Sequence, residues 1–206
     1  MRLIILAAVS LGVSACGGSG SSTTAPPTSL TVTLAANPIA SGTRVQAVAT
    51  NSNGTPASNV SWSSSNTDIA TVTSSGEVTG ELKGSAIIRA NSGGVTGQAT
   101  VTVVPGAPAS IVVYSGDNQS AAKGAQVKDP LCTNVLDLHG NLIVGAVVTY
   151  TVQTGGGQLA QPTAPETNSS GIAISGLWTL GPTAGSQKVV ASSPGAGTVT
   201  FTATAQ

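Results

Sequence analysis

The feature that most constrains the fold of this chain is an alternation of apolar and polar side chains with a period of two. Residues 62–90 show it clearly, because the run Ile69–Ser74 alternates and is then interrupted by Ser75-Gly76, Gly80 and Gly84. A period of two is typical of a strand with one buried face. Turn residues recur along the whole chain at spacings of about eight to twelve residues, which predicts an all-β protein built from small sandwiches.

Composition excludes several classes of protein. Charged residues make up 7% and hydrophobic residues 40%, and the formal net charge at pH 7 is zero. Disorder requires low hydrophobicity with high net charge, so packed strands are the better interpretation. The few Lys and Arg residues are scattered singly, which leaves no basic patch for phosphates and predicts that nucleic acid is not a partner.

The N-terminus has the pattern of an export signal. Met1-Arg2 precedes an apolar run from Leu3 to Val13, which is too short to span a bilayer. The run ends in Val13-Ser14-Ala15-Cys16, which resembles the lipobox of bacterial lipoproteins. The resemblance implies that residues 1–15 are a signal peptide and that Cys16 is the site of lipid attachment. The alternative is an ordinary cleaved signal with an unrelated cysteine.

The residues after the signal predict an anchored, tethered protein. Several acyl chains on Cys16 would hold the protein firmly to a membrane. Gly17 rather than aspartate follows Cys16. If the resemblance extends to enterobacteria-like sorting of lipoproteins, this implies the outer membrane, on either its surface or its periplasmic side. Residues 16–29 are rich in Gly, Ser, Thr and Pro, and this composition predicts a flexible linker.

Residues 30–104 form the first predicted domain. Trp62–Asn66, Ile69–Val72, Ser75–Gly80 and Gly84 occur in the order of the signature of the bacterial Ig-like group 2 domain. This unit therefore resembles that family, which is found in intimin-type surface proteins. The resemblance implies an immunoglobulin-like β-sandwich, and we expect Trp62 to fill the middle of its core.

Residues 109–206 form the second predicted domain, after a short proline-stiffened joint at Pro105–Pro108. This unit resembles the bacterial Ig-like group 1 domain of the invasin and intimin family, from which it departs at Leu142 and Asn168. The matching residues are Pro130-Leu131, Asp137, Gly140-Asn141, Gly145, Val148–Val152, Gly155–Gly157, Gly171–Ala173, Trp178–Gly181 and Ala184-Gly185. Because the joint is short, we expect the two domains to lie end to end with limited bending.

Candidate residues for chemistry are few. His139, the single histidine, sits in the hairpin-type turn Asp137–Asn141, where we expect it to face solvent. The resemblance implies that Asp137 stabilises this turn by accepting backbone N–H groups. Gly155–Gly157 lacks the Gly-Lys-Ser/Thr and the helix that a phosphate loop needs.

The remaining candidate residues do not form a recognisable catalytic or metal-binding set. Asp117, Asp129, Asp137 and Glu166 are too dispersed for an EF-type calcium loop, although calcium at the joint stays open. Cys132 is expected to pack as a small apolar residue. We therefore predict no catalytic residues, no cofactor and no metal.

The sequence thus favours a cell-envelope lipoprotein that displays Ig-like domains for adhesion or for contact with a protein or glycan. The alternative is a passive structural spacer without a ligand, and an enzyme is the third hypothesis. Trp62 and Trp178 both lie in motifs of the core type, so Tyr114 is the aromatic whose exposure bears on a ligand. The ligand, the oligomeric state and the angle between the domains do not follow from the sequence.

Overall fold

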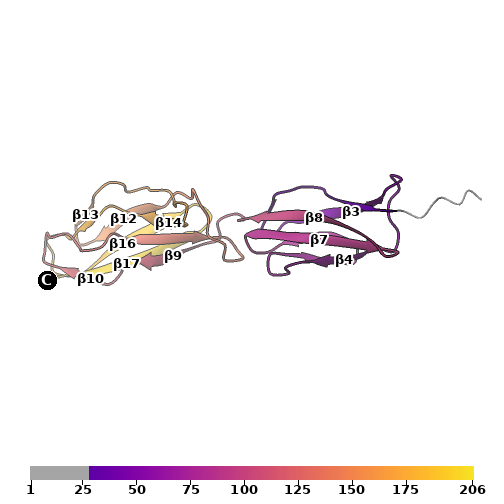
Figure 1. Ribbon diagram of the computed structural model, residues 1–206. Helices are drawn as coiled ribbons and strands as arrows, with labels where there is room; N and C mark the ends of the chain where they lie inside the picture. The colour runs from indigo at the N-terminus through magenta and orange to yellow at the C-terminus, as the bar shows by residue number, and fades with distance from the viewer. Residues whose placement is uncertain (1–27) are drawn as a thin grey trace, which may run out of the picture.

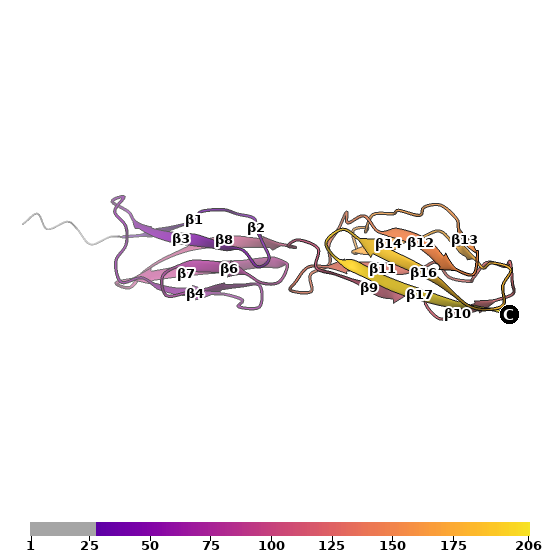
Figure 2. The same cartoon turned by 180° about the vertical axis from the view of Figure 1, so that it is seen from behind.

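The computed structural model describes residues 28–206, where the chain forms seventeen β-strands and no helix. The strands build two sandwiches in succession, β1 to β8 between Leu30 and Val104 and β9 to β17 between Ser110 and Ala205. Figures 1 and 2 show the sandwiches end to end in an elongated molecule, with the C-terminus at the far end of the second. The predicted all-β, immunoglobulin-like class is confirmed.

Several predictions concern the N-terminal region that precedes the described residues. The signal peptide 1–15, the lipid site Cys16 and nearly all of the linker 16–29 lie outside residues 28–206. Within residues 28–206, no helix is long and apolar enough to cross a membrane.

The first sandwich pairs a sheet in the order β1-β3-β6-β5 with a sheet in the order β2-β8-β7-β4. All pairings are antiparallel except that of β2 with β8, which is parallel. The strands are β1 Leu30–Leu34, β2 Ile39–Ala40, β3 Arg44–Asn51, β4 Ser61–Ser64, β5 Ala70–Val72, β6 Glu77–Gly80, β7 Gly84–Ser92 and β8 Val95–Val104.

The core of the first sandwich follows the alternation seen in the sequence. In β7, Ala86, Ile88 and Ala90 are buried while their neighbours point outward, and Val101 and Val103 of β8 face the same interior. Burying one face of each strand is the dominant favourable term in a small sandwich.

Trp62 does not occupy the middle of this core, so that expectation is wrong. It lies on β4, an edge strand that pairs only with β7, and its side chain is only half-buried. Fully buried Val78 and Ile88 fill the centre instead. An edge strand has a neighbour on one side only, so a large side chain on it is covered incompletely.

The second sandwich contains a four-stranded sheet β10-β17-β16-β12, a three-stranded sheet β14-β11-β9 and the small pair β13-β15. Its strands are β9 Ser110–Ser115, β10 Gln119–Ala121, β11 Cys132–Leu136, β12 Thr149–Thr154, β13 Gln158–Leu159, β14 Ile172–Ile174, β15 Trp178–Thr179, β16 Gly185–Ser193 and β17 Gly197–Ala205.

Aromatic side chains fill the core of the second sandwich. Trp178 and Phe201 are completely buried, as expected for Trp178, and the rings of Tyr150 and Phe201 lie 6.1 Å apart at 42°. The Tyr150 hydroxyl is 2.9 Å from Thr133 Oγ1 and donates to the Ala173 carbonyl at 3.0 Å. Burial raises the pKa of Tyr150 to about 12, although the hydrogen bond with Thr133 acts in the opposite direction.

Candidate interaction surfaces

The turn Asp137–Asn141, which we call the joint turn, lies between the two sandwiches and is organised by the Asp137 carboxylate. Its Oδ1 accepts the backbone N–H groups of His139 at 2.9 Å and Asn141 at 2.8 Å. Its Oδ2 accepts the Asn141 side-chain amide and the Gly106 N–H, both at 2.8 Å. This is the turn-stabilising role that the family resemblance implied.

The electrostatics of Asp137 follow from these contacts. Burial acts to raise the pKa of the carboxyl, but the N–H donors from Gly106, Asn141 and His139 outweigh burial and hold the pKa below its ordinary value of 3.8. The carboxylate therefore stays ionised, and four N–H groups already occupy its two oxygens.

Two side chains of the joint turn reach into the first sandwich. Asn141 Oδ1 accepts the backbone N–H of Lys83 at 2.7 Å, and its Nδ2 donates to the Glu81 carbonyl at 3.2 Å. His139 Nδ1 lies 2.7 Å from Ser41 Oγ, and its Nε2 lies 3.5 Å from a Glu81 carboxylate oxygen. The joint turn is thus fastened to the loops around residues 41–43 and 81–83.

The expectation that His139 faces solvent is wrong, because its side chain is 29% exposed and bridges the two sandwiches. The sequence offers no signal for this contact. Ser41 and His139 are 98 positions apart, and only the stacking of the domains brings them together.

A cleft of about 420 Å³ opens beside the joint turn. It is lined by Ala40–Thr43 of the first sandwich, by the connection Ala107–Ala109, and by Asp137, Leu138 and His139. Leu138, at 84% exposure, is the most exposed of the large hydrophobic residues that the structure describes. The cleft is therefore walled mostly by small and apolar groups.

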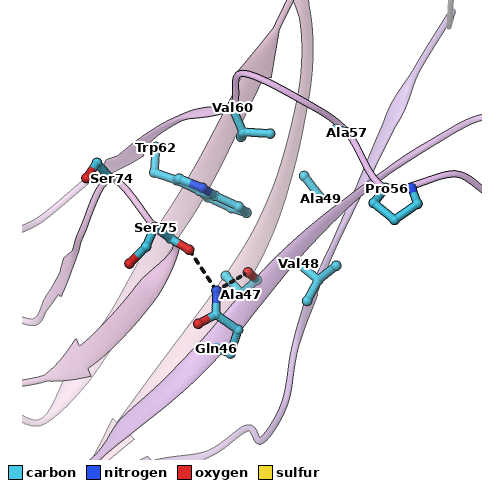
Figure 3. A pocket seen from close by; sticks show the side chains of 10 residues that line it. All are labelled: Gln46, Ala47, Val48, Ala49, Pro56, Ala57, Val60, Trp62, Ser74 and Ser75. Carbon is cyan, nitrogen blue, oxygen red and sulfur yellow. Dashed lines mark hydrogen bonds between the residues drawn. The ribbon is translucent and has the colours of Figure 1, made fainter.

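A second cleft, of about 280 Å³, lies beside Trp62 in the first sandwich (Figure 3). β3 pairs with β6 only from Arg44 to Gln46, so the part of β3 from Ala47 onward is not paired with β6. The Gln46 side-chain amide spans the gap by donating to the Ala47 carbonyl at 2.9 Å and the Ser75 carbonyl at 2.8 Å.

The Trp62 indole closes one side of this cleft. Figure 3 shows it projecting from β4 toward Ala47 and Ala49 of β3. Gly76 has φ +84° and meets the indole edge so closely that a Cβ would lie 3.0 Å from a ring carbon. Only glycine suits both the backbone and this approach. The cleft is an opening in the core that the indole half fills.

The third surface is the outer face of the sheet β14-β11-β9, which we call the Tyr114 face. Asn134 of β11 pairs with Val112 of β9, and Cys132 pairs with Ile174 of β14. Residues directly opposite one another project from the same face of a sheet. The exposed fractions are 39% for Val112, 59% for Tyr114 and 44% for Ile174.

Cys132 lies under this face and is 7% exposed, so its predicted role as a packed residue in a strand is confirmed. The Tyr114 face carries the exposed apolar side chains of Val112 and Ile174, together with the exposed tyrosine that the sequence analysis singled out. The register of β9 and β11 shifts beside Cys132, which adds Tyr114 to β9 as an extra residue.

The other sequence candidates have local structural roles. Asp117 Oδ1 accepts the N–H of Thr202 at 2.7 Å. Gly155 has φ +88° and lies over the buried Gln187, whose Oε1 accepts the Gly181 N–H at 2.8 Å and whose Nε2 donates to the Thr183 carbonyl at 2.8 Å. Among residues 28–206, no three His, Cys, Asp or Glu side chains gather as metal ligands. Asp129 and Glu166 join no such group.

The first sandwich is similar in sequence to known proteins. Residues 26–103 match the family model described as "Bacterial Ig-like domain (group 2)". Ice-binding protein 1 of Shewanella frigidimarina (strain NCIMB 400) is 38% identical over 102 residues, which are 47% of this chain and 11% of that protein. The chain therefore spans only a small part of the length of this relative.

Solved structures with a similar arrangement come from bacterial surface proteins. The Escherichia coli adhesin FdeC is 20% identical with a TM-score of 0.49, over 84% of this chain and 63% of that chain. The D00-D0 domain of intimin is 16% identical with a TM-score of 0.49, over 84% and 98%. Domains 1–6 of the surface layer protein SbsC are 19% identical with a TM-score of 0.41, over 88% and 28%.

Proposed function

From the match of residues 26–103 to the bacterial Ig-like group 2 model, we propose that the chain is a cell-envelope lipoprotein that displays two Ig-like domains for adhesion. The second domain is proposed to be of group 1 and to span residues 109–206, with the first spanning 30–104. The partner that fits the exposed surface best is another protein.

The observation that carries this proposal is the Tyr114 face. Among residues 28–206, seven of the ten exposed large hydrophobic residues lie between positions 112 and 174 of the second domain, and three of the seven belong to this face. Apolar area with a tyrosine is characteristic of protein-binding surfaces, because the ring adds contact area at low cost in side-chain entropy. A glycan site would instead favour a broad aromatic platform with many polar neighbours.

The anchor is proposed from the sequence. Cleavage before Cys16 and acylation of its sulfur and amino group would fix the chain to a membrane, with residues 16–29 as the tether. The elongated shape in Figure 1 supports the same arrangement, because the first domain and the C-terminus of the chain lie at opposite ends of the described molecule. The Tyr114 face would then lie in the domain farther from the membrane.

The passive spacer remains the second candidate function, and the joint turn favours it. A molecule whose only task is to hold a fixed length needs its domains fastened together, and four side-chain contacts cross this joint. A spacer predicts that changes on the Tyr114 face leave the phenotype of the cell unaltered.

Location is tested on intact cells with a tag at the C-terminus and an added protease. Loss of the tag without lysis supports surface display, whereas retention until the outer membrane is broken places the rod in the periplasm and favours the spacer. Substitution of Cys16 by serine should release the protein from the membrane fraction if the lipid anchor is correct.

Adhesion is tested with residues 28–206 against panels of immobilised proteins and glycans. Tyr114→Ser and Ile174→Ser should abolish binding to any protein that the unaltered chain retains. Val48→Ser is the matched control, because Val48 is also 44% exposed but lies on the first domain. Equal binding by all three variants would contradict the assignment of the Tyr114 face.

A further inference from the structure

We propose that the joint turn locks the two Ig-like domains into one rigid body. The proposal concerns the mechanics of the molecule and holds whether the rod serves adhesion or spacing. Its parts are the joint turn on the second domain, the loops around Ser41 and Glu81 on the first, and the connection between them.

The central contact of the lock is made by the Asn141 side-chain amide, and Asp137 fixes the orientation of that amide. Asp137 holds both the backbone N–H and the side-chain amide of Asn141 at 2.8 Å. The Asn141 amide is thereby aimed at the first domain, where its oxygen meets the Lys83 N–H and its nitrogen meets the Glu81 carbonyl. Because the turn is organised before the domains meet, little side-chain entropy is lost when the contacts form.

The connection between the domains is held by the same carboxylate. The Gly106 N–H donates to Asp137 Oδ2 at 2.8 Å, and a Cβ at position 106 would lie 2.9 Å from the Ser41 carbonyl oxygen. One aspartate therefore holds the turn, the connecting segment and the residue that docks onto the first domain. A linker tied at its middle cannot act as a free hinge.

The side chains of Ser41, His139 and Glu81 are of the types found in a nucleophilic triad, but here they connect the two domains. Ser41 is 8% exposed, so its hydroxyl is not available to a substrate. The N–H of Gly42, which would have to stabilise an oxyanion next to such a serine, donates to the Gly80 carbonyl at 2.8 Å. The three groups join two domains and do not form a catalytic site.

The second fastener is His139. Its Nδ1 lies 2.7 Å from Ser41 Oγ, and its Nε2 lies 3.5 Å from a Glu81 carboxylate oxygen. The imidazole therefore contacts both loops of the first domain that face the joint turn. The contact between His139 and Glu81 contributes little by itself, because the two side chains are 29% and 32% exposed.

The lock is tested by amide relaxation in nuclear magnetic resonance on residues 28–206. The unaltered protein should give one rotational correlation time for both domains. His139→Ala combined with Asn141→Ala should give two shorter times, one for each domain. Asn53→Ala is the matched control, because Asn53 Oδ1 accepts the N–H and the hydroxyl of Thr55 in the turn after β3, at the end of that strand opposite to Ser41–Thr43, and it should leave the single correlation time unchanged.

Independent tumbling of the unaltered domains would overturn the proposal, and so would unchanged tumbling of the double variant. Ser41→Ala combined with Glu81→Gln removes the partners of the His139 ring but keeps the contacts of Asn141 with backbone groups of Glu81 and Lys83, so it should loosen the joint less than the double variant does.

Discussion

At the scale of single residues, Asp137 is the side chain on which most contacts of the joint depend. Its two oxygens accept four N–H groups from three residues. An asparagine at this position has one acceptor oxygen and would leave donors without partners. Asp137→Asn should therefore lower the free energy of unfolding by about 1–3 kcal/mol, the usual cost of leaving buried polar groups unsatisfied.

The prediction for Asp137 is measured by urea unfolding at neutral and acidic pH. Because the pKa of Asp137 is lowered in the folded state, its contribution is present above pH 3.8 and is lost as the pH falls through the lowered value. Asp137→Asn should therefore differ from the unaltered protein at pH 7 and converge with it in strong acid. Asp129→Asn, at an exposed position, is the control and should change stability little.

Tyr150 gives a second prediction at this scale. Its hydroxyl lies within hydrogen-bonding distance of Thr133 Oγ1 and donates to the Ala173 carbonyl in the core. Tyr150→Phe should cost about 1–2 kcal/mol in the free energy of unfolding, because these two groups lose their partner. Chemical unfolding measures the cost. Tyr114→Phe is the control, since Tyr114 is 59% exposed and no hydrogen bond of its hydroxyl appears in the structure.

The pKa of Tyr150 adds a dependence on alkaline pH. The folded value of about 12 exceeds the ordinary value of 10.0, so the unfolded chain loses this proton first. The contribution of Tyr150 is complete below pH 10 and is lost as the pH rises toward 12. Tyr150→Phe should remove this loss, and an unaltered alkaline transition in the variant would contradict the assignment.

The two tryptophans should differ in their contribution to stability. Trp178 is completely buried, so Trp178→Ala should cost about 3–5 kcal/mol. Trp62 is half-buried at a cleft, so Trp62→Ala should cost about half as much. Unfolding of each variant can be followed by the fluorescence of the remaining tryptophan and by circular dichroism. Equal costs would contradict the different burial of the two rings.

At the scale of elements, the strands were predictable where one face is buried and one is solvated. The alternation around β7 and β8 follows directly from the exclusion of Ala86, Ile88, Val101 and Val103 from water. Sheet order is not contained in that pattern. The sequence marks β4 as a strand but not as an edge, and for that reason the depth of Trp62 was overestimated.

The candidate sites were predictable to a smaller degree. The turn role of Asp137 follows from the family resemblance, and the sequence singles out Tyr114 as the aromatic outside the core motifs without fixing its exposure. The contacts of His139 and Asn141 do not, because their partners lie between 58 and 98 positions away and belong to another domain. Such contacts depend on how two finished sandwiches stack, and a period of two carries no information about stacking.

At the scale of the whole molecule, a side chain of the joint turn in the second domain protects a backbone amide of the first domain. The Lys83 N–H belongs to the first domain, yet its acceptor is Asn141 Oδ1 of the second at 2.7 Å. Exchange of this amide with solvent requires the joint to open. Its exchange rate therefore measures the fraction of molecules in which the domains are unlocked.

Asn141→Ala should accelerate exchange at the Lys83 amide by about tenfold or more, which corresponds to the loss of one hydrogen bond of about 1.4 kcal/mol. The Ile87 amide is the internal control, because it donates to Ser65 Oγ at 2.8 Å within the first domain and should exchange at an unchanged rate. Acceleration at both amides would indicate general destabilisation of the first domain. Acceleration at Lys83 alone would show that the second domain protects the first through a single side chain, which is the behaviour of a rod whose joint is part of its structure.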